Sequence, residues 1–405
     1  MRVYRVGGSV RDTLLGLPVK DHDYVVVGAS AAQLLAQGFI QVGADFPVFL
    51  HPHTRAEYAL ARTERKSAPG YKGFAVFASP EVSLEEDLSR RDLTINAMAL
   101  DAEGQLIDPF GGASDLRAGV LRHVSAAFVE DPVRVLRIAR FAARFQFRIA
   151  PETEILMRRM VDAGELDHLV AERVWQELVR GLRSKRPSLM FRVLRDCGAL
   201  QRVVPELDRL AGMPLPPDRA DTGDLFDYAM TLVDIAAAEA QPLSVRFSVL
   251  CLPLGHALSA LVERLRVPGE YRAMAKLVAG NVDAVVQSHA FDAAAAVHLF
   301  DRCDAYRKPE RFAQFLSACG VVLAAGGVGS RARSGRALRS EHQPELFLAA
   351  LHAARSVKAT PLIAGLSDPA AIQATLRAAR IAAIESKIAA DAGAVSPSTG
   401  GTQQR

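Results

Sequence analysis

Two aspartates near the N-terminus have the type and spacing of a metal-binding pair. Asp21-His22-Asp23 leads directly into the apolar run 23–27. In a strand, residues two apart point to the same face, so Asp21 and Asp23 can share one cation. Carboxylate oxygens with room for water suit magnesium. A D-x-D pair also occurs in solvated turns, but the strand-like run that follows would hold this pair rigidly.

A glycine pair stands shortly before the aspartates. Gly7-Gly8 follows a short β-like run and precedes Ser9–Leu15, which has helical character. Glycine lets a backbone approach a phosphate closely, and a helix N-terminus favours anions. The pair also fits an ordinary strand-to-helix turn. Together with the D-x-D at this spacing, it indicates nucleotide chemistry more specifically than either feature alone.

Arginines form two further groups. In the segment 90–96, two arginines precede an aspartate and an asparagine, an arrangement that can clamp triphosphate oxygens and a ribose hydroxyl. A charged helix start gives the same pattern. The second group repeats every three or four residues, so a helix would carry it on one side. Its members are Arg134, Arg137, Arg140, Arg144 and Arg148. For the last two, a solvated basic face is the simpler interpretation.

Short strands and helices must position these residues within the first hundred positions. Asp23–Val27 is the strongest strand prediction, because β-branched and aromatic residues are bounded by polar residues and a glycine. Val3–Val6, Val48–Leu50 and Glu57–Ala61 have similar character. Glu64–Ser83, rich in Gly, Pro and Ser, predicts a mobile loop.

The character of the chain changes at Pro132. From there to about Ala390, segments rich in Ala, Leu and Arg have helical period. The last stretch, Asp391–Arg405, is rich in Gly, Ser, Thr and Gln and predicts disorder. The order of elements therefore predicts an α/β head on an all-helical body.

The composition of the chain limits the class of protein to which it can belong. A chain of 405 residues, 50% hydrophobic and 23% charged, fits two or three globular domains. Its net charge of +4 is too small to identify a nucleic-acid binder. Four well-separated cysteines favour a reducing, cytoplasmic compartment over a disulfide framework or zinc ribbon. No apolar signal region or membrane-length run is present, so we expect no membrane partner.

Five ordered segments resemble the nucleotidyltransferase superfamily that includes DNA polymerase beta. More narrowly, they resemble the class II tRNA nucleotidyltransferases, the CCA-adding enzymes of bacteria. The segments are Val6–Gly16, Asp21–Asp23, Ala61–Lys66, Arg91–Ala97 and Glu130–Phe141. The similarity spans nearly the whole chain and is denser up to about residue 205.

The resemblance implies a fold and a domain order. It implies an α/β, polymerase-beta-like head followed by an all-α neck, body and tail. The expected ranges are head 1–125, neck 126–205, degenerate HD-like body 206–300, tail 301–390 and disordered C-terminus 391–405.

The resemblance also implies roles for single residues. Asp21 and Asp23 would be catalytic and hold Mg²⁺, with Glu57 as a possible third carboxylate. Contacts with the triphosphate or ribose would come from Gly8, Arg11, Arg91, Arg137 and Arg140. Asp131 and Arg134 would hydrogen-bond the edge of an incoming base, since arginine supplies only donors and a carboxylate only acceptors. Such a pair would accept C or A.

The implied reaction is template-independent transfer from CTP and ATP to a tRNA 3′-hydroxyl, releasing pyrophosphate, with no role for DNA. Three alternatives stay open: a poly(A) polymerase, an enzyme adding only CC or only A, and a catalytically inactive RNA-binding or nucleotide-sensing module. Monomer and homodimer are both compatible with the sequence. Some relatives carry a His-Asp metal pair after a run like Val245–Cys251, where this chain has Leu252-Pro253. We therefore expect no phosphatase or phosphodiesterase activity.

Overall fold

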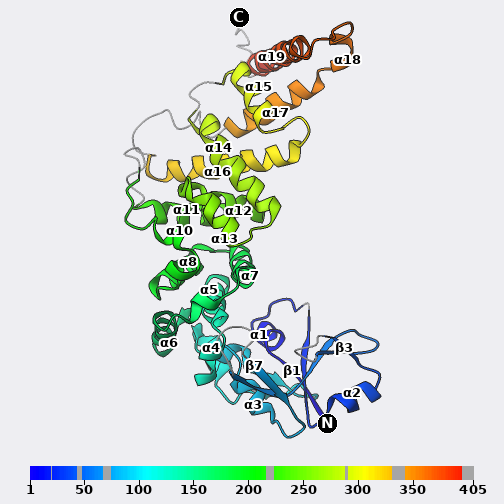
Figure 1. Ribbon diagram of the computed structural model, residues 1–405, viewed down its shortest axis with the longest axis vertical. Coiled ribbons are helices and arrows are strands. Elements are labelled where there is room, and N and C mark those ends of the chain that lie inside the picture. The colour runs from blue at the N-terminus through cyan, green and yellow to red at the C-terminus, as the bar shows by residue number, and fades with distance from the viewer. Residues whose placement is uncertain are drawn as a thin grey trace, which may run out of the picture. The chain divides into compact units, whose positions relative to one another are not determined.

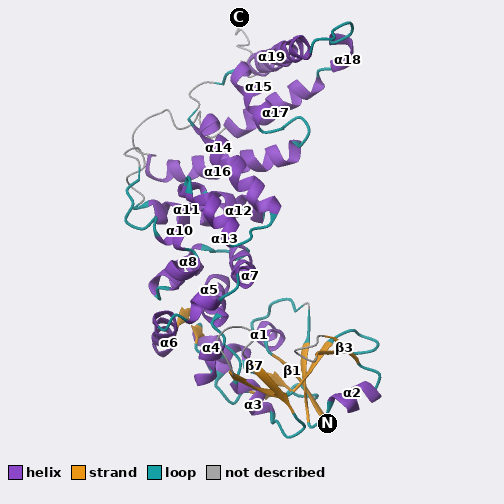
Figure 2. Cartoon of the chain, viewed as in Figure 1, coloured by secondary structure: helices purple, strands orange, loops and turns teal. Residues whose placement is uncertain are grey.

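The computed structural model describes residues 1–19, 21–42, 48–66, 74–215, 223–287, 291–330 and 343–394. The chain divides into two compact units, which are described separately. The first comprises Met1–Arg209 with Glu263–Arg266, and the second comprises Leu210–Val262 with Val267–Arg405. Within the described residues, every strand belongs to the first unit (Figure 2). The predicted order of an α/β head before an all-helical region is confirmed.

The described part of the first unit contains a seven-stranded sheet with the spatial order β3-β4-β5-β2-β1-β8-β9. In Figure 1 it occupies the blue and cyan part of the chain. Its strands are β1 (Arg2–Val6), β2 (Asp23–Val27), β3 (Ile40–Val42), β4 (Val48–Leu50), β5 (Glu57–Leu60), β8 (Ala99–Leu100) and β9 (Leu106–Ile107). The predicted strands 3–6, 23–27, 48–50 and 57–61 are all present.

Alternation along the strands gives the sheet two apolar faces. On one face Val6, Val25 and Leu88 belong to one buried cluster. On the other, Val26 and Phe49 belong to a second. Four short helices accompany the sheet: α1 (Gly8–Leu14), α2 (Ala31–Ala36), α3 (Leu84–Ser89) and α4 (Gly112–Ala118).

The prediction of a loop over Glu64–Ser83 is wrong for much of that segment. The backbones of β6 (Arg62–Lys66) and β7 (Phe74–Ala78) pair as an antiparallel hairpin. The Gly, Pro and Ser content that predicted a loop is concentrated between the strands, whereas Phe74–Ala78 consists of residues that favour or tolerate a strand. Residues 67–73 lie outside the described part of the chain.

Helices complete the first unit. They are α5 (Val133–Phe145), α6 (Pro151–Asp162), α7 (Ala171–Leu182), α8 (Ser188–Asp196), α9 (Ala199–Val203) and α10 (Pro205–Asp208). Short 3-10 turns, η1 (Thr94–Asn96), η2 (Ala126–Glu130) and η3 (Glu165–His168), and a small parallel pair, β10 (Val120–Leu121) with β11 (Arg148–Ile149), connect these parts. Helix α5 packs against both α7 and α8.

The regular elements in the described part of the second unit are all helices. Its helices are α11 (Leu225–Ala238), α12 (Leu243–Leu250), α13 (Ala257–Arg264, whose last two residues belong to the first unit), α14 (Gly269–Val286), α15 (Ala293–Arg302), α16 (Pro309–Ser330), α17 (Gln343–Ser356), α18 (Ala359–Leu362) and α19 (Pro369–Ala394). A 3-10 turn, η5 (Leu252–Leu254), follows α12.

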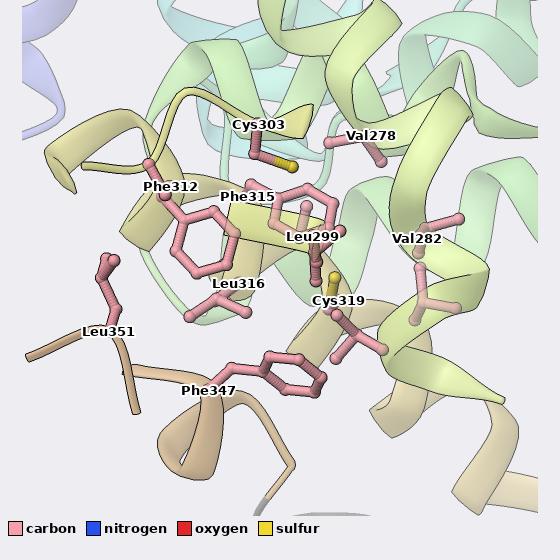
Figure 3. Close-up of a cluster of buried hydrophobic side chains, with 14 of the residues drawn as sticks. Val278, Val282, Leu299, Cys303, Phe312, Phe315, Leu316, Cys319, Phe347 and Leu351 are labelled. Carbon is pink, nitrogen blue, oxygen red and sulfur yellow. The ribbon is translucent and has the colours of Figure 1, made fainter. Parts of the chain in front are cut away.

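The core of the second unit is formed by α11, α12 and α14 to α17, with Ile384 of α19. Figure 3 shows Phe312, Phe315 and Phe347 packed with Leu299 and the thiol of Cys319. Because α19 continues to Ala394, the expectation that disorder begins at Asp391 is wrong for its first residues; 395–405 lie outside the described chain.

Candidate active site

The acidic edge of the sheet is set by the pairing of three strands. β2 runs antiparallel to β1 and parallel to β5, and the registers place Asp23 opposite both Val6 and Glu57. In-register residues of neighbouring strands point to the same face, so the carboxylates of Asp23 and Glu57 lie side by side. Asp21 lies just before β2 and is exposed, as are Asp23 and Glu57.

The electrostatics of this edge suit a cation. Partial desolvation by the neighbouring protein raises the pKa of the Asp23 carboxyl; nearby Arg91 opposes this, and the negative charge of Asp21 raises it further. All three side chains offer carboxylate oxygens, the donors that magnesium-like ions prefer. In the described residues, no three His, Cys, Asp or Glu side chains are gathered closely enough to hold a metal ion. The three carboxylates are thus suitable ligands for such an ion, but they are not gathered into a closed binding site.

A cavity of about 670 Å³ lies beside this edge, within the first unit. Every residue predicted for the site lines it except Asp21. Those residues are Gly8, Arg11, Asp23, Glu57, Arg91, Asp131, Arg134, Arg137 and Arg140. The sheet edge and α1 therefore share one cavity with residues of α5, which follow α1 and β2 by more than a hundred positions.

The glycine pair brings an arginine close to the backbone. Gly7 has φ +71, and a Cβ there would lie 2.7 Å from a terminal nitrogen of Arg91. A side chain at this position would therefore displace the Arg91 guanidinium and strain the backbone. Arg91 also pairs with the buried carboxylate of Asp87, Nη2 to Oδ2 3.2 Å.

A buried network joins Arg11 to Arg137. Arg11 donates from Nη1 to Asn96 Oδ1 at 2.5 Å, and Asn96 donates to Asp92 Oδ1 at 2.9 Å. Arg137 donates from Nε to Asp92 Oδ2 at 2.8 Å. Burial alone would raise the pKa of Asp92, but Arg137 and the hydrogen bond from Asn96 hold it at about 2. Asp92 is therefore the ionised link between α1 and α5.

Phenylalanine rings of α5 support arginines of both α5 and α1. The guanidinium of Arg140 lies 4.2 Å from the centroid of Phe141, and that of Arg11 lies 4.9 Å from the centroid of Phe145. Arg144 is exposed, as expected, and pairs with Asp12 at 2.9 Å. The prediction that Arg148 shares this helix face is wrong, because Gln146 adopts a left-handed conformation that ends α5, and Arg148 lies in β11.

The two residues predicted to read the base line the cavity but have different partners. Arg134 is buried and donates to the carbonyl oxygens of Ala127 at 2.8 Å and Arg90 at 2.6 Å. Asp131 accepts two hydrogen bonds from Arg173, at 3.1 and 2.8 Å. The acceptor and the donor of the proposed pair are thus both held in place by other groups.

Helix α7 supplies a wall of the cavity that sequence reasoning missed. Arg173, Gln176, Glu177 and Arg180 lie at helical spacing and all line the cavity. Glu177 is buried and accepts from Arg140 at 2.5 Å and from Arg180 at 3.0 Å. The available signal was a glutamate on the apolar side of an amphipathic helix, which identifies a buried charge but not its partner.

Two family models match the chain. One, the poly A polymerase head domain, matches residues 3–122, and the other, a probable RNA and SrmB-binding site of polymerase A, matches residues 146–210. No helix among the described residues has the length and hydropathy needed to span a membrane. Fold and site together define a nucleotidyltransferase with a polymerase-beta-like head. Enzymes of this class generally depend on a metal ion.

Relatives that match nearly the whole chain identify the kind of nucleotidyltransferase more narrowly. The Multifunctional CCA protein of Aromatoleum aromaticum is 53% identical over 408 residues, covering 96% of this chain and 98% of the relative. That of Chromobacterium violaceum is 52% identical, covering 95% and 98%. The chain belongs to the bacterial CCA-adding enzymes, the tRNA nucleotidyltransferases that its motifs resemble. These matches identify the activity as CCA addition to tRNA rather than poly(A) synthesis.

Solved structures show the same fold. A CCA-adding enzyme determined with ATP has a TM-score of 0.66 at 21% identity, covering 99% of this chain and 92% of that one. The Thermotoga maritima CCA-adding enzyme complexed with tRNA has a TM-score of 0.62 at 21% identity, covering 96% and 91%.

Proposed function

We propose that this chain completes the CCA end of tRNA at the carboxylate edge of its sheet, with Mg²⁺ held by Asp21, Asp23 and Glu57. The supporting observation is that Asp23 and Glu57 stand in register at the wall of an arginine-lined cavity. When bound, the metal ion would lower the pKa of the tRNA 3′-hydroxyl and neutralise charge at the reacting phosphate. The family, and four well-separated cysteines that suit a reducing compartment, favour a cytoplasmic location.

The arginines would bind the triphosphate and the ribose. Arg11 and Arg91 lie against the Gly7-Gly8 turn, where the absence of side chains lets a phosphate approach the backbone. Arg137 and Arg140 would add charge from α5, where each is already oriented by a carboxylate. Orienting partners reduce the conformational entropy lost when a guanidinium binds a phosphate oxygen.

Asp131 and Arg134 would select the base. The carboxylate offers acceptors to the exocyclic amino group shared by C and A, and the guanidinium offers donors to a ring nitrogen. G and U present a carbonyl oxygen where C and A present the amino group, so the same pair would leave their edges mismatched. One side chain offers only acceptors and the other only donors, and this complementarity supports the assignment.

A gel-resolved extension assay tests the proposed function. A tRNA ending at the discriminator base, and separately a generic RNA, would be incubated with single nucleotides and with CTP plus ATP. We expect three added nucleotides on the tRNA only, requiring both CTP and ATP, with clean termination. Long adenosine tails on either RNA would contradict the proposal.

The roles of the aspartates have their own test. Replacing both, Asp21→Ala with Asp23→Ala, is expected to lower incorporation by several orders of magnitude while leaving the Kd for tRNA nearly unchanged, because the carboxylates act on the metal and the reacting phosphate. The measurement combines the extension assay with a filter-binding titration. Weakened tRNA binding with an unchanged rate per bound complex would refute the assignment.

A further inference from the structure

A single buried carboxylate lies behind three arginines of the cavity. Asp87, in α3, is 0% exposed and does not itself line the cavity. Its Oδ1 accepts from Nη2 of Arg90 at 3.1 Å and from the backbone N–H of Arg62 at 3.3 Å, and its Oδ2 accepts from Nη2 of Arg91 at 3.2 Å. All three of these arginines line the cavity. Asp87 therefore contacts three residues of the site while staying hidden from any ligand in it.

Asp87 is ionised in this buried position. Burial favours the neutral acid and raises the pKa of the carboxyl, but the charges and hydrogen bonds of Arg90 and Arg91 outweigh burial and hold that pKa below its usual value. An ionised carboxylate offers acceptors only. Its two oxygens therefore fix the direction in which the donors around it point.

Arg91 is held from two sides. Its Nη2 faces Asp87, whereas its Nη1 lies against the Gly7 backbone and donates to the carbonyl oxygen of Asn96 at 3.5 Å. Its Nε is buried and has no hydrogen-bond partner among the described residues. A desolvated donor without a partner destabilises a fold. Packing alone therefore does not account for the placement of this guanidinium, and departures of this kind are typical of functional sites.

Other arginines assigned to the triphosphate are also oriented by carboxylates. Asp92 holds Arg137 at 2.8 Å, and Glu177 holds Arg140 at 2.5 Å. Both of these acids line the cavity, so a ligand can meet them directly. Asp87 does not line it, so any effect of this carboxylate on a ligand passes through the residues that it contacts.

Building on the triphosphate-binding role proposed for Arg91, we propose that Asp87 is a positioning residue for nucleotide binding. It holds the Arg91 guanidinium against the Gly7-Gly8 turn, so that the remaining N–H groups of Arg91 face the phosphates of the incoming nucleotide. Because the phosphate chain is common to CTP and ATP, Asp87 acts equally on both. It takes no part in selecting the base.

Equilibrium titrations with Mg²⁺ present test this role. Asp87→Asn keeps the size of the side chain but leaves one oxygen as an acceptor, so it cannot pair with arginines on both sides. We expect the Kd for CTP, for ATP and for tripolyphosphate, which has neither base nor ribose, to rise by the same factor. That factor is about tenfold, the loss typical of one charge-assisted hydrogen bond. The Kd for tRNA should change by less than about twofold. The control is Glu85→Gln, which removes the same charge from an exposed position of α3.

A double-mutant cycle separates positioning from a merely structural role. In an Arg91→Ala background, Asp87→Asn should weaken tripolyphosphate binding by less than about twofold, because the guanidinium through which the carboxylate acts is gone. A full tenfold loss in that background would overturn the proposal. So would an unchanged Kd in the single variant, or tighter binding caused by the gain in net positive charge.

The titrations remain readable if the variants are less stable. Partial unfolding lowers the number of binding sites but not the affinity of the folded molecules. If Asp87→Asn does not fold at all, Asp87→Glu keeps the charge but moves the oxygens by one methylene, and it should raise the Kd for CTP and for tripolyphosphate equally. Because these titrations need no extension of tRNA, failure of the wild type to add CCA would refute the proposed function and leave the test of Asp87 intact.

Discussion

Arg134 is the residue on which base selection most directly depends. Its guanidinium donates to the carbonyl oxygens of Ala127 and Arg90, which fix its position. Arg134→Ala would remove the donors offered to the base and leave the phosphate-binding arginines of the cavity in place. We expect kcat/KM for CTP and ATP to fall toward the values for UTP and GTP, so that discrimination shrinks about tenfold or more for one lost charge-assisted hydrogen bond. Single-nucleotide extension with each triphosphate measures this.

The control for Arg134 is Arg148→Ala, which removes an exposed arginine that does not line the cavity. It should leave discrimination unchanged. An equal loss for all four nucleotides in Arg134→Ala would argue against base selection and for a structural role at the two carbonyls.

Single residues were predictable where their chemistry is local in sequence. The D-x-D pair and the glycine pair each fall within a few positions, so residue type and strand period were enough. The alignment of Glu57 with Asp23 depends on which strands pair and in which register, and the sequence pattern does not specify either. The partners of Asp131 and Arg140 on α7 were missed because they lie about forty positions away and follow no motif.

At the scale of elements, Asp92 joins the segment before η1 to α5. Its folded pKa of about 2 lies below the ordinary value of 3.8, so its carboxylate stabilises the fold above about pH 4, and this contribution is lost as pH falls toward 2. Asp92→Asn should therefore lower the free energy of unfolding by about 2 kcal/mol at pH 7, with a smaller difference at pH 3. Urea unfolding followed by the fluorescence of Trp175, the single tryptophan of the chain, reports on the first unit.

Asp162→Asn is the matched control for Asp92→Asn, because Asp162 is exposed at the end of α6. A stability difference that stays constant from pH 7 to pH 3 would contradict an ionised Asp92 as the cause.

The elements were predicted unevenly for a physical reason. Strands with one or both faces buried, such as Asp23–Val27, carry a strong apolar pattern, and the structure matches the predicted bounds. The hairpin of β6 and β7 was predicted as a loop because Gly, Pro and Ser between the strands dominated the composition of the window. Helix α5 was predicted correctly, but its end was not, because a left-handed Gln146 is seldom signalled by residue type.

At the scale of the whole molecule, the second unit has its own buried core and no assigned chemistry. The run Val245–Cys251, which resembles the start of an HD metal site, is largely buried in α12, and Cys251 is 1% exposed. The next residues, Leu252–Leu254, form η5 instead of supplying a His-Asp pair. Imidazole and carboxylate ligands are needed to hold a catalytic divalent ion at such a site.

We therefore expect the purified chain to add CCA yet not to hydrolyse 2′,3′-cyclic nucleotides with Ni²⁺ or Mg²⁺ present, although its relatives are called multifunctional. The measurement is the release of adenosine monophosphate from 2′,3′-cyclic AMP, assayed in each fraction of a gel-filtration run. The Asp21→Ala, Asp23→Ala double variant serves as control, because it should have the same background while losing CCA addition. Hydrolysis that co-elutes with the protein and disappears with EDTA would show that the second unit holds a metal through residues other than a His-Asp pair.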